Sequence, residues 1–243
     1  MTTLFEAVAN QPMDQVVALI VGYSIGSIPF AWLIARAKGV NLLKVGSGSS
    51  GATNAARAIG WKWFFPIFLL DAAKGFVPVF FAGKTTAELG YSVDPVLFIV
   101  VGAILGHTFS PWLRFKGGKA IATGVGAVLA LSPATGGIAL AVFALMFFTT
   151  RFVSLGSICG ALSVPVSYAF LGESPHHLDH MVFLSVMAAF VNWKHRTNIV
   201  RLLNGTESRA VKRKLALTTC VFHAKAATDS TAKLPPVPHE SCH

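Results

Sequence analysis

AIATGVGAVLALSPATGGIALAVFALMFFTT, residues 120–150, is the stretch that decides the fold, because its 31 residues include no charge. A membrane-spanning helix needs about 20 apolar residues, so this stretch is longer than one straight crossing requires. The SPATGG segment at 132–137 carries the proline and glycines that bend or end helices. Residues 120–150 therefore form either one long kinked helix or two short helices joined by a turn.

The composition of the whole chain places it in a membrane. Of its 243 residues, 53% are hydrophobic and only 12% are charged, and the mean hydropathy is +0.62. A soluble domain carries roughly 25% charged residues, so a soluble globular fold is excluded. The first 15 residues contain no Lys or Arg, so we expect no cleavable signal peptide. Three cysteines give no even disulfide framework.

The distribution of positive charge decides how often the chain crosses the membrane. Besides 120–150, the apolar segments are 16–35, 63–83, 95–113, 152–172 and 181–193. If 120–150 crosses twice, 18 of the 20 Lys and Arg residues fall on one side, and only Lys84 falls on the other. If it crosses once, Arg151 and the C-terminal charges change sides and the bias collapses.

The positive-inside rule therefore predicts an all-α polytopic membrane protein with seven transmembrane helices. Its N-terminus lies outside and its C-terminus lies in the cytoplasm. The net charge of +10 is explained by this topology and by attraction to anionic membrane lipid, so we expect no nucleic-acid partner.

The first unusual cytoplasmic segment is the loop 46–57, GSGSSGATNAAR. Its glycines let backbone N–H groups turn toward an anion, and its serines add donors. Asn54 and Arg57 stand three residues apart on what reads as the start of a helix. The loop matches G-x-G-x-x-G by spacing, but a transmembrane helix precedes it, so a dinucleotide fold is excluded. The alternative to a phosphate site is a flexible Gly/Ser linker.

The second segment is 115–119, FKGGK, which opens the fourth predicted span. Glycines between lysines at a helix N-terminus combine free N–H groups, the positive end of the helix dipole and fixed charge. A simple positive anchor at the membrane surface is the alternative. Two such loops on one face favour a ligand that carries one or two phosphates.

The third group lies at the start of the sixth span and the end of the last. Ser154 and Ser157 are one helical turn apart, and His195 and Asn198 share a helix face after Trp193. A juxtamembrane basic helix is also a common lipid anchor.

Three ionisable residues lie within predicted spans. Asp71 and Lys74 stand at i and i+3, where an unpaired charge costs about 2.5–3.5 kcal/mol on insertion scales. They either pair with each other or orient the site. His107 is either a hydrogen-bonded core histidine or a group that supports the site.

The C-terminal segment 206–243 is predicted to be a basic, disordered cytoplasmic tail that follows a membrane domain of residues 1–205. Cys220, His223, His239, Cys242 and His243 have the ligand types of a zinc site. The sequence between them has little apolar periodicity to support a fold, so we expect no metal and no cofactor.

These segments, in this order, resemble the bacterial membrane glycerol-3-phosphate acyltransferases that use acyl phosphate as donor. The matching stretches are 22–30, 46–57, 70–75, 106–107, 115–119, 153–157 and 195–207. The resemblance implies transfer of a fatty acyl group from acyl phosphate to the 1-hydroxyl of glycerol 3-phosphate, which forms lysophosphatidic acid in phospholipid biosynthesis. It also implies the bacterial inner membrane, an active site facing the cytoplasm, and a soluble partner enzyme that makes acyl phosphate.

The resemblance assigns roles residue by residue. The catalytic residues it implies are His195, Asn198, Lys119 and Ser47. The phosphate-binding residues are Ser47, Gly48, Arg57, Gly117, Gly118, Lys119 and Ser157. The supporting residues are Asn54, Asp71, Lys74, His107 and Glu207. Asn54 or Asn198 would hold the glycerol or the oxyanion, and either His195 or the substrate phosphate would take the proton.

Two other classes of protein compete with this interpretation. A transporter or flippase for a phosphorylated solute or lipid also needs polar loops at membrane depth. Against it, no inverted repeat is visible, and the polar groups gather on one face. A structural membrane anchor would have no use for the Gly/Ser loop.

Overall fold

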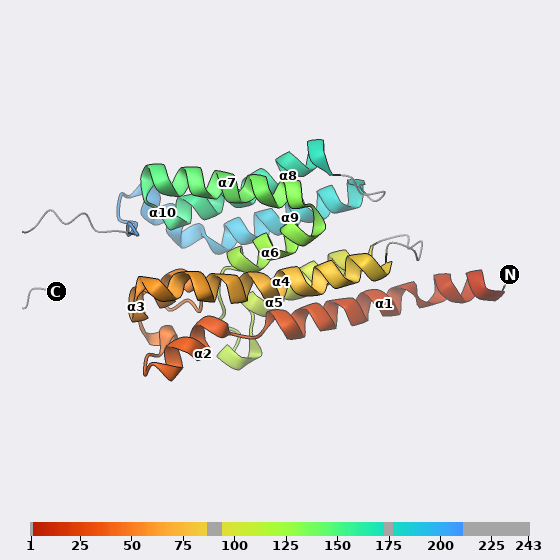
Figure 1. The fold of residues 1–243 in the computed structure, drawn as a ribbon, viewed down its shortest axis with the longest axis horizontal. Helices are drawn as coiled ribbons and strands as arrows, with labels where there is room; N and C mark the ends of the chain where they lie inside the picture. The colour runs from red at the N-terminus through yellow and green to blue at the C-terminus, as the bar shows by residue number, and fades with distance from the viewer. Residues whose placement is uncertain (1, 87–93, 173–176, 211–243) are drawn as a thin grey trace, which may run out of the picture. The chain divides into compact units, whose positions relative to one another are not determined.

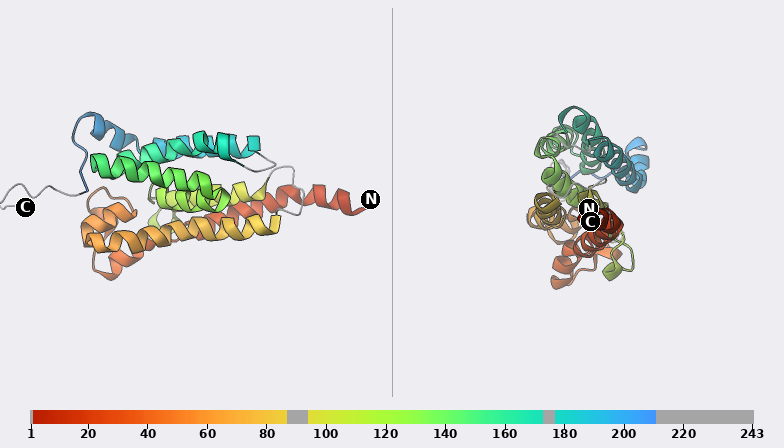
Figure 2. Two further views of the ribbon diagram at one scale, coloured as in Figure 1. Left: turned by 45° about the horizontal axis from the view of Figure 1, so that its top comes forward. Right: turned by 90° about the vertical axis from the view of Figure 1, so that its right-hand side faces the viewer.

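The computed structural model describes residues 2–86, 94–172 and 177–210, and every regular element in these ranges is helical. The α-helices are α1 (Thr2–Gly26), α2 (Phe30–Ala37), α3 (Ala52–Ile59), α4 (Phe64–Thr86), α5 (Pro95–Thr108), α6 (Ile121–Leu131), α7 (Pro133–Thr150), α8 (Val153–Leu171), α9 (His177–Lys194) and α10 (Arg196–Leu203). Three 3-10 turns, η1 (Leu42–Lys44), η2 (Trp61–Trp63) and η3 (Pro111–Leu113), lie between them. The long helices run side by side (Figures 1 and 2).

The chain divides into two compact units, Met1–Arg209 and Ala210–His243. The helices named above all belong to the first unit. Of the second unit, only Ala210 belongs to the described residues, so the five Cys and His residues of the zinc pattern lie outside them.

The uncharged stretch 120–150 forms two helices, which confirms the second alternative. α6 ends at Leu131 and α7 begins at Pro133, with Ser132 as the N-cap between them. Val128 of α6 packs in one cluster with Ala139 of α7. Ile121 and Phe143, farther from the turn, line the same cavity. The two helices are therefore an antiparallel hairpin, in which α6 also packs against α4 (Figure 1).

Five helical segments in the described part of the chain are long and apolar enough to cross a membrane. They are Met13–Ala37, Trp61–Lys84, Pro95–Leu113, Pro133–Thr150 and Val153–Leu171. α6 is apolar but shorter, and α9, which opens with polar residues, is not among the five. The all-helical membrane fold is confirmed, whereas the count of seven crossings stays a prediction.

The first span, predicted from the uncharged segment 16–35, is broken within the membrane segment. α1 ends at Gly26 and α2 begins at Phe30. The carbonyl groups freed by the break find donors inside the protein. Lys74 Nζ donates to the Ile28 carbonyl (2.9 Å), and Ser110 Oγ donates to the Ser27 carbonyl (2.7 Å). Irregular backbone at membrane depth requires such internal partners.

Candidate active site

A polar cavity opens at the end of the helices where α6 and α8 begin and α9 ends. About 860 Å³ of space lies between its walls, part of it open to the outside. The polar and charged side chains that line it come from six separate stretches of the chain: Ser47, Ser49, Thr53, Asn54, Arg57, Asp71, His107, Lys119, Ser154, Ser157, His195, Asn198, Arg201 and Glu207.

The loop 46–57 is folded around the buried side chain of Asn54. Its Oδ1 accepts a hydrogen bond from the Ser47 N–H (3.0 Å). Its Nδ2 donates to the carbonyls of Ser49 (2.9 Å), Leu42 and Val45 (3.2 Å each). The amide is thus occupied by the loop itself. Asn54 therefore shapes the wall of the cavity and is not free to hold glycerol or an oxyanion.

Two glycines of this loop adopt backbone conformations that the fold of the loop requires. Gly46 and Gly48 have φ of 58° and 67°, a conformation that L side chains rarely adopt. A Cβ on Gly46 would lie 2.3 Å from Asn54 Oδ1. The Gly48 N–H donates to the Val45 carbonyl (3.1 Å), and Gly48 does not line the cavity. In this structure the Gly48 N–H is thus directed at the loop itself, and the role of Gly48 in binding phosphate stays a prediction.

Gly117 and Gly118 also differ from expectation, because their N–H groups are not free. They donate to the carbonyls of Thr108 (3.0 Å) and His107 (3.1 Å) at the end of α5. A Cβ on Gly117 would lie 2.0 Å from the His107 carbonyl oxygen, and one on Gly118 would lie 2.1 Å from His107 Nε2. These glycines allow the loop to pack against α5, and neither lines the cavity.

Helix N-termini take the place of the glycines as backbone donors. The first turns of α3, α6 and α8 border the cavity through Ala52 and Thr53, Ile121 and Ala122, and Val153 and Ser154. The first N–H groups of a helix have no partner within the helix, and the helix dipole makes this end positive. Three such ends around one cavity favour an anion.

Three cationic side chains, Arg57, Lys119 and Arg201, add full charges to the cavity. Lys119 Nζ donates to Asn198 Oδ1. Burial, together with the charges of Arg201 and Arg57 and against the opposing effect of Glu207, lowers the pKa of Lys119 to about 8. Arg57 is exposed, and its Nη2 donates to the Ser208 carbonyl (3.1 Å).

Glu207 connects the polar groups of α10. Its Oε1 accepts from Asn198 Nδ2 (2.8 Å), and its Oε2 accepts from Arg201 Nε (2.7 Å). Burial favours the neutral acid, but these hydrogen bonds, the Ser154 hydroxyl and the charge of Arg201 together outweigh it and hold the pKa of Glu207 below its usual range. Asn198 is thus fixed on one side by an anion and on the other by Lys119.

His195 lies at the start of α10, and one of its ring nitrogens is hydrogen-bonded to the backbone. Its Nδ1 is 2.9 Å from the Val191 carbonyl oxygen. A carbonyl only accepts, so Nδ1 carries the proton and Nε2 keeps a lone pair. Burial lowers the pKa of His195 to about 4, and the charge of Lys119 acts in the same direction. The imidazole is therefore neutral at pH 7.

The ionisable residues of the spans pair with each other. Asp71 Oδ1 lies 2.9 Å from Lys74 Nζ, and both side chains are 2% exposed. His107 Nδ1 lies 3.3 Å from Thr123 Oγ1 and 3.9 Å from Asp71 Oδ1. Asp71 and His107 line the cavity, whereas Lys74 lies outside its lining. Pairing within the span, one of the two predicted alternatives, is what the structure contains.

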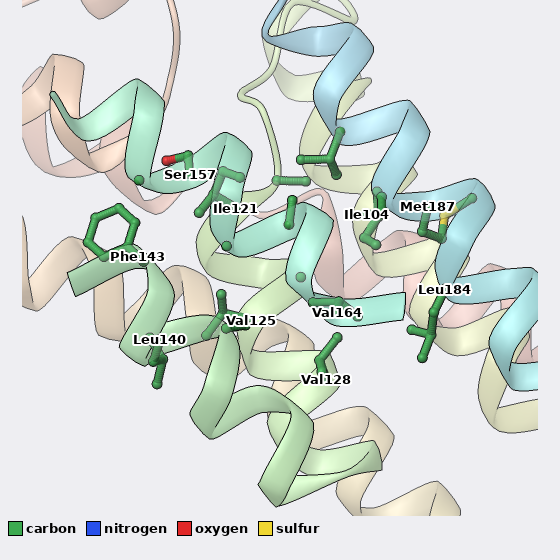
Figure 3. Close-up of a pocket in the computed structure, with 18 of the residues that line it drawn as sticks. Ile104, Ile121, Val125, Val128, Leu140, Phe143, Ser157, Val164, Leu184 and Met187 are labelled. Atoms are coloured by element: carbon green, nitrogen blue, oxygen red, sulfur yellow. The ribbon is translucent and has the colours of Figure 1, made fainter. Parts of the chain in front are cut away.

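An apolar cavity adjoins the polar one, and Figure 3 shows residues that line it. About 710 Å³ of space, part of it open to the outside, lies between α4, α5, α6, α7, α8 and α9. Both cavities share Phe68, Ala120, Ile121, Phe143 and Ser157 as lining residues. The Ser157 hydroxyl, which donates to the Val153 carbonyl (2.8 Å), marks the boundary between them.

Comparison with known proteins identifies this arrangement. A family model described as glycerol-3-phosphate acyltransferase matches residues 16–205. The chain belongs to the glycerol-3-phosphate acyltransferase family. Two curated members bear this out: the one from Desulforamulus reducens is 42% identical over 200 residues (82% of this chain, 96% of that protein), and the one from Endomicrobium trichonymphae is 41% identical over 196 residues (80% and 95%).

Two solved structures of the acyltransferase PlsY, described as an integral membrane glycerol 3-phosphate acyltransferase, match the same fold. The glycerol 3-phosphate form is 38% identical with a TM-score of 0.72, and the lysophosphatidic acid form is 36% identical with a TM-score of 0.70. Each match covers 80% of this chain and 94% of PlsY. The resemblance inferred from the sequence motifs is thereby confirmed.

In this acyltransferase, most residues singled out in the sequence meet in one cavity. Arg201 also lines this cavity, but the sequence analysis did not single it out. It stands one turn after Asn198 and six residues before Glu207, and this spacing is the signal that could have revealed it. Within the described ranges, no group of three His, Cys, Asp or Glu side chains is placed to hold a metal.

Proposed function

We propose that this protein transfers a fatty acyl group from acyl phosphate to the 1-hydroxyl of glycerol 3-phosphate, forming lysophosphatidic acid and inorganic phosphate. The observation that carries the proposal is the junction of a cationic cavity with an apolar cavity at Ser157. The reaction needs both environments, because its donor joins a phosphate to a long hydrocarbon chain. Membership of the acyltransferase family gives independent support.

The cations divide between the two anionic substrates. Arg57 and Ser47, on the loop 46–57, bind the phosphate of glycerol 3-phosphate, and a guanidinium can hold it through two parallel hydrogen bonds. Lys119, Arg201 and Ser157 hold the phosphoryl group of the donor near the first turn of α6. Binding in this way brings the acyl carbon close to the acceptor hydroxyl.

The chemical step requires no enzyme nucleophile, because acyl phosphate is a mixed anhydride with a good leaving group. The 1-hydroxyl oxygen forms a bond to the acyl carbon, the bond from that carbon to the phosphate oxygen breaks, and the phosphate leaves with its electron pair. His195 Nε2 takes the hydroxyl proton as general base. Its pKa rises when two phosphate anions enter the cavity.

Charge develops on the carbonyl oxygen during this step. Lys119 stabilises the oxyanion, and its own position is fixed by Asn198. Asn198 in turn is fixed by Glu207, so Glu207 acts on the reaction by positioning. Asn54 supports the site by holding the loop 46–57, Lys74 with its partner Asp71 holds the break between α1 and α2, and His107 holds the loop at Gly118.

The apolar cavity takes the acyl chain of the donor, between helices and within the plane of the bilayer. Its lining residues include Val125, Val128, Val164 and Leu184, all apolar. Because lipid tails are as apolar as these side chains, close packing against them holds the chain, while the phosphate supplies orientation.

The proposed topology has seven crossings of the bacterial inner membrane, with the N-terminus outside and the polar cavity facing the cytoplasm. Support comes from the hairpin of α6 and α7, which returns the chain to the side it left, and from the Lys and Arg distribution. Residues 1–205 are the membrane acyltransferase domain. Residues 206–243 are a basic cytoplasmic tail whose first residues still reach the site through Glu207.

Glycerol 3-phosphate, acyl phosphate and membrane lipid are the partners that this function requires, together with a soluble enzyme that makes acyl phosphate. The test uses purified protein in lipid vesicles, with glycerol 3-phosphate as acceptor and acyl phosphate as donor. Acyl phosphate should yield lysophosphatidic acid, and Lys119→Met should reduce its formation. Formation by the Lys119→Met variant at the wild-type rate would contradict the assignment of the site.

A further inference from the structure

The apolar cavity shares one end with the polar cavity, and its other end, called the closed end below, lies among buried side chains. Ser157, Ile121 and Phe143 stand at the end shared with the polar cavity, and Val128, Val164 and Leu184 stand at the other (Figure 3). Along α8, Val164 follows Ser157 by seven residues, which corresponds to about 10 Å of helix. Leu184 lies the same number of residues from Val191 on α9. The lining residues of α8 and those of α9 therefore extend over the same length of helix, about 10 Å.

The residues at the closed end are part of the packed core. Val128, Val164 and Leu184 are 6%, 9% and 2% exposed, and they form one cluster with Ala139 and Tyr168. Protein cores are close-packed, so a chain that reaches this cluster cannot lengthen without displacing a buried side chain.

Tyr168 is the member of this cluster that polar contacts fix in position. It is 1% exposed, and its hydroxyl lies 2.8 Å from His180 Nδ1. The opposite nitrogen, His180 Nε2, lies 3.2 Å from Asp94 Oδ2. This chain of polar contacts joins α8 and α9 to the residue that caps α5. The closed end is thus braced by three helices.

We propose that Val128, Val164 and Leu184 form a floor that sets the acyl-chain length accepted by this protein. The inference rests on the proposed function, because it takes the apolar cavity as the acyl site. A chain that ends at the floor gains contact with all three residues. A shorter chain leaves space unfilled, and a longer one meets the core.

Val164 offers the sharpest test, because the same helix carries a matched control. Val164→Ala deepens the cavity and should move the preferred donor to a longer chain. Val164→Phe fills it and should move the preference to a shorter one. Val166 lies two residues away, is 61% exposed and does not line the cavity, so Val166→Phe adds the same bulk outside it.

The experiment measures kcat/KM for acyl phosphates of graded chain length with glycerol 3-phosphate in excess. One methylene in a hydrophobic pocket changes kcat/KM by roughly 10- to 200-fold, so the ratio between a long and a short donor should change by about tenfold or more. The change should be in opposite directions for Val164→Ala and Val164→Phe, and absent in Val166→Phe. If Val164→Phe fails to accumulate in the membrane, Val164→Ala and Leu184→Ala carry the test.

The outcomes separate this inference from the proposed function. Wild-type protein that makes no lysophosphatidic acid from any acyl phosphate contradicts the proposed function, and the floor with it. Active wild type with an unchanged chain-length profile in Val164→Ala and Leu184→Ala overturns the floor alone. If Val166→Phe shifts the chain-length preference as much as Val164→Phe does, the floor is also overturned, because the effect would then not depend on the cavity.

Discussion

Asn198→Asp should make the activity depend on pH in a way that no other substitution at this position does. In the wild type, Asn198 Nδ2 donates to Glu207 Oε1 at 2.8 Å, and Oδ1 accepts from Lys119. An aspartate keeps the acceptor for Lys119 but places a carboxylate oxygen against Glu207. Two carboxylates at this distance cannot both ionise easily, so the pair should hold a proton at a higher pH than either acid alone.

The magnitude follows from the contact that is lost. A hydrogen bond to a charged group contributes about 1.5–3 kcal/mol, which corresponds to roughly 10- to 150-fold in kcat/KM if Asn198 positions Lys119 in the transition state. At high pH, Asn198→Asp should show this full loss. As the pH falls, a proton shared between the introduced carboxylate and Glu207 restores the hydrogen bond, and the ratio of variant to wild-type activity should rise.

The assay is kcat/KM for lysophosphatidic acid formation across a pH series, given as the ratio to wild type. Asn198→Ala should lose activity by a similar factor, but its ratio should not recover toward acid pH. Asn204→Asp, which places an exposed carboxylate at the end of α10, serves as the matched control and should stay close to wild type. A ratio for Asn198→Asp that stays flat or falls as the pH decreases would refute the reasoning.

Three further predictions address separate parts of the site. Arg57→Lys should lose nearly as much activity as Arg57→Ala, about 10- to 150-fold, because an ammonium cannot form two parallel hydrogen bonds to phosphate; wild-type kinetics in Arg57→Ala would remove Arg57 from the site. The pKa of Lys119 near 8 predicts that kcat/KM falls as the pH rises through about 8, because the charged form is lost, and Lys119→Met should lack this step. Gly118→Ala should lower thermal stability by about 1–3 kcal/mol, since its Cβ meets His107 Nε2 at 2.1 Å, whereas Gly137→Ala, with open space at its Cβ, should not; equal unfolding temperatures for these two variants would contradict the packing role.

The membership of the cavity could be predicted largely from sequence, because polar groups are conspicuous in so apolar a chain. Ser47, Arg57, Lys119, Ser157, His195 and Asn198 were singled out, and all line one cavity. All of them except Ser157, which lies within the apolar segment 152–172, stood in segments whose composition departed from that of a membrane span. The spans themselves were visible for the same reason, and the SPATGG segment marked the turn between α6 and α7.

The hydrogen bonds that could not be predicted join groups to backbone partners that only the folded chain brings close. The N–H groups of Gly117 and Gly118 find carbonyls about ten residues earlier, and only the packing of the loop on α5 brings these together. Lys74 donates to the Ile28 carbonyl across 46 residues, and this partner could not be predicted, although Gly26 and Pro29 favour a break in the first span. Arg201 was missed for a different reason: it resembled a topology charge, and its spacing to Asn198 and Glu207 was the signal for a contact that forms when the chain folds back after α10.

The position of an oxygen label in the product tests the central claim most directly. The purified protein is given acyl phosphate and glycerol 3-phosphate that carries ¹⁸O in its 1-hydroxyl group, and the products are analysed by mass spectrometry. Attack of this hydroxyl on the acyl carbon predicts that all of the label is found in the ester of lysophosphatidic acid and none in inorganic phosphate. Label in the phosphate, or no lysophosphatidic acid at all, would contradict acyl transfer in the cavity described here.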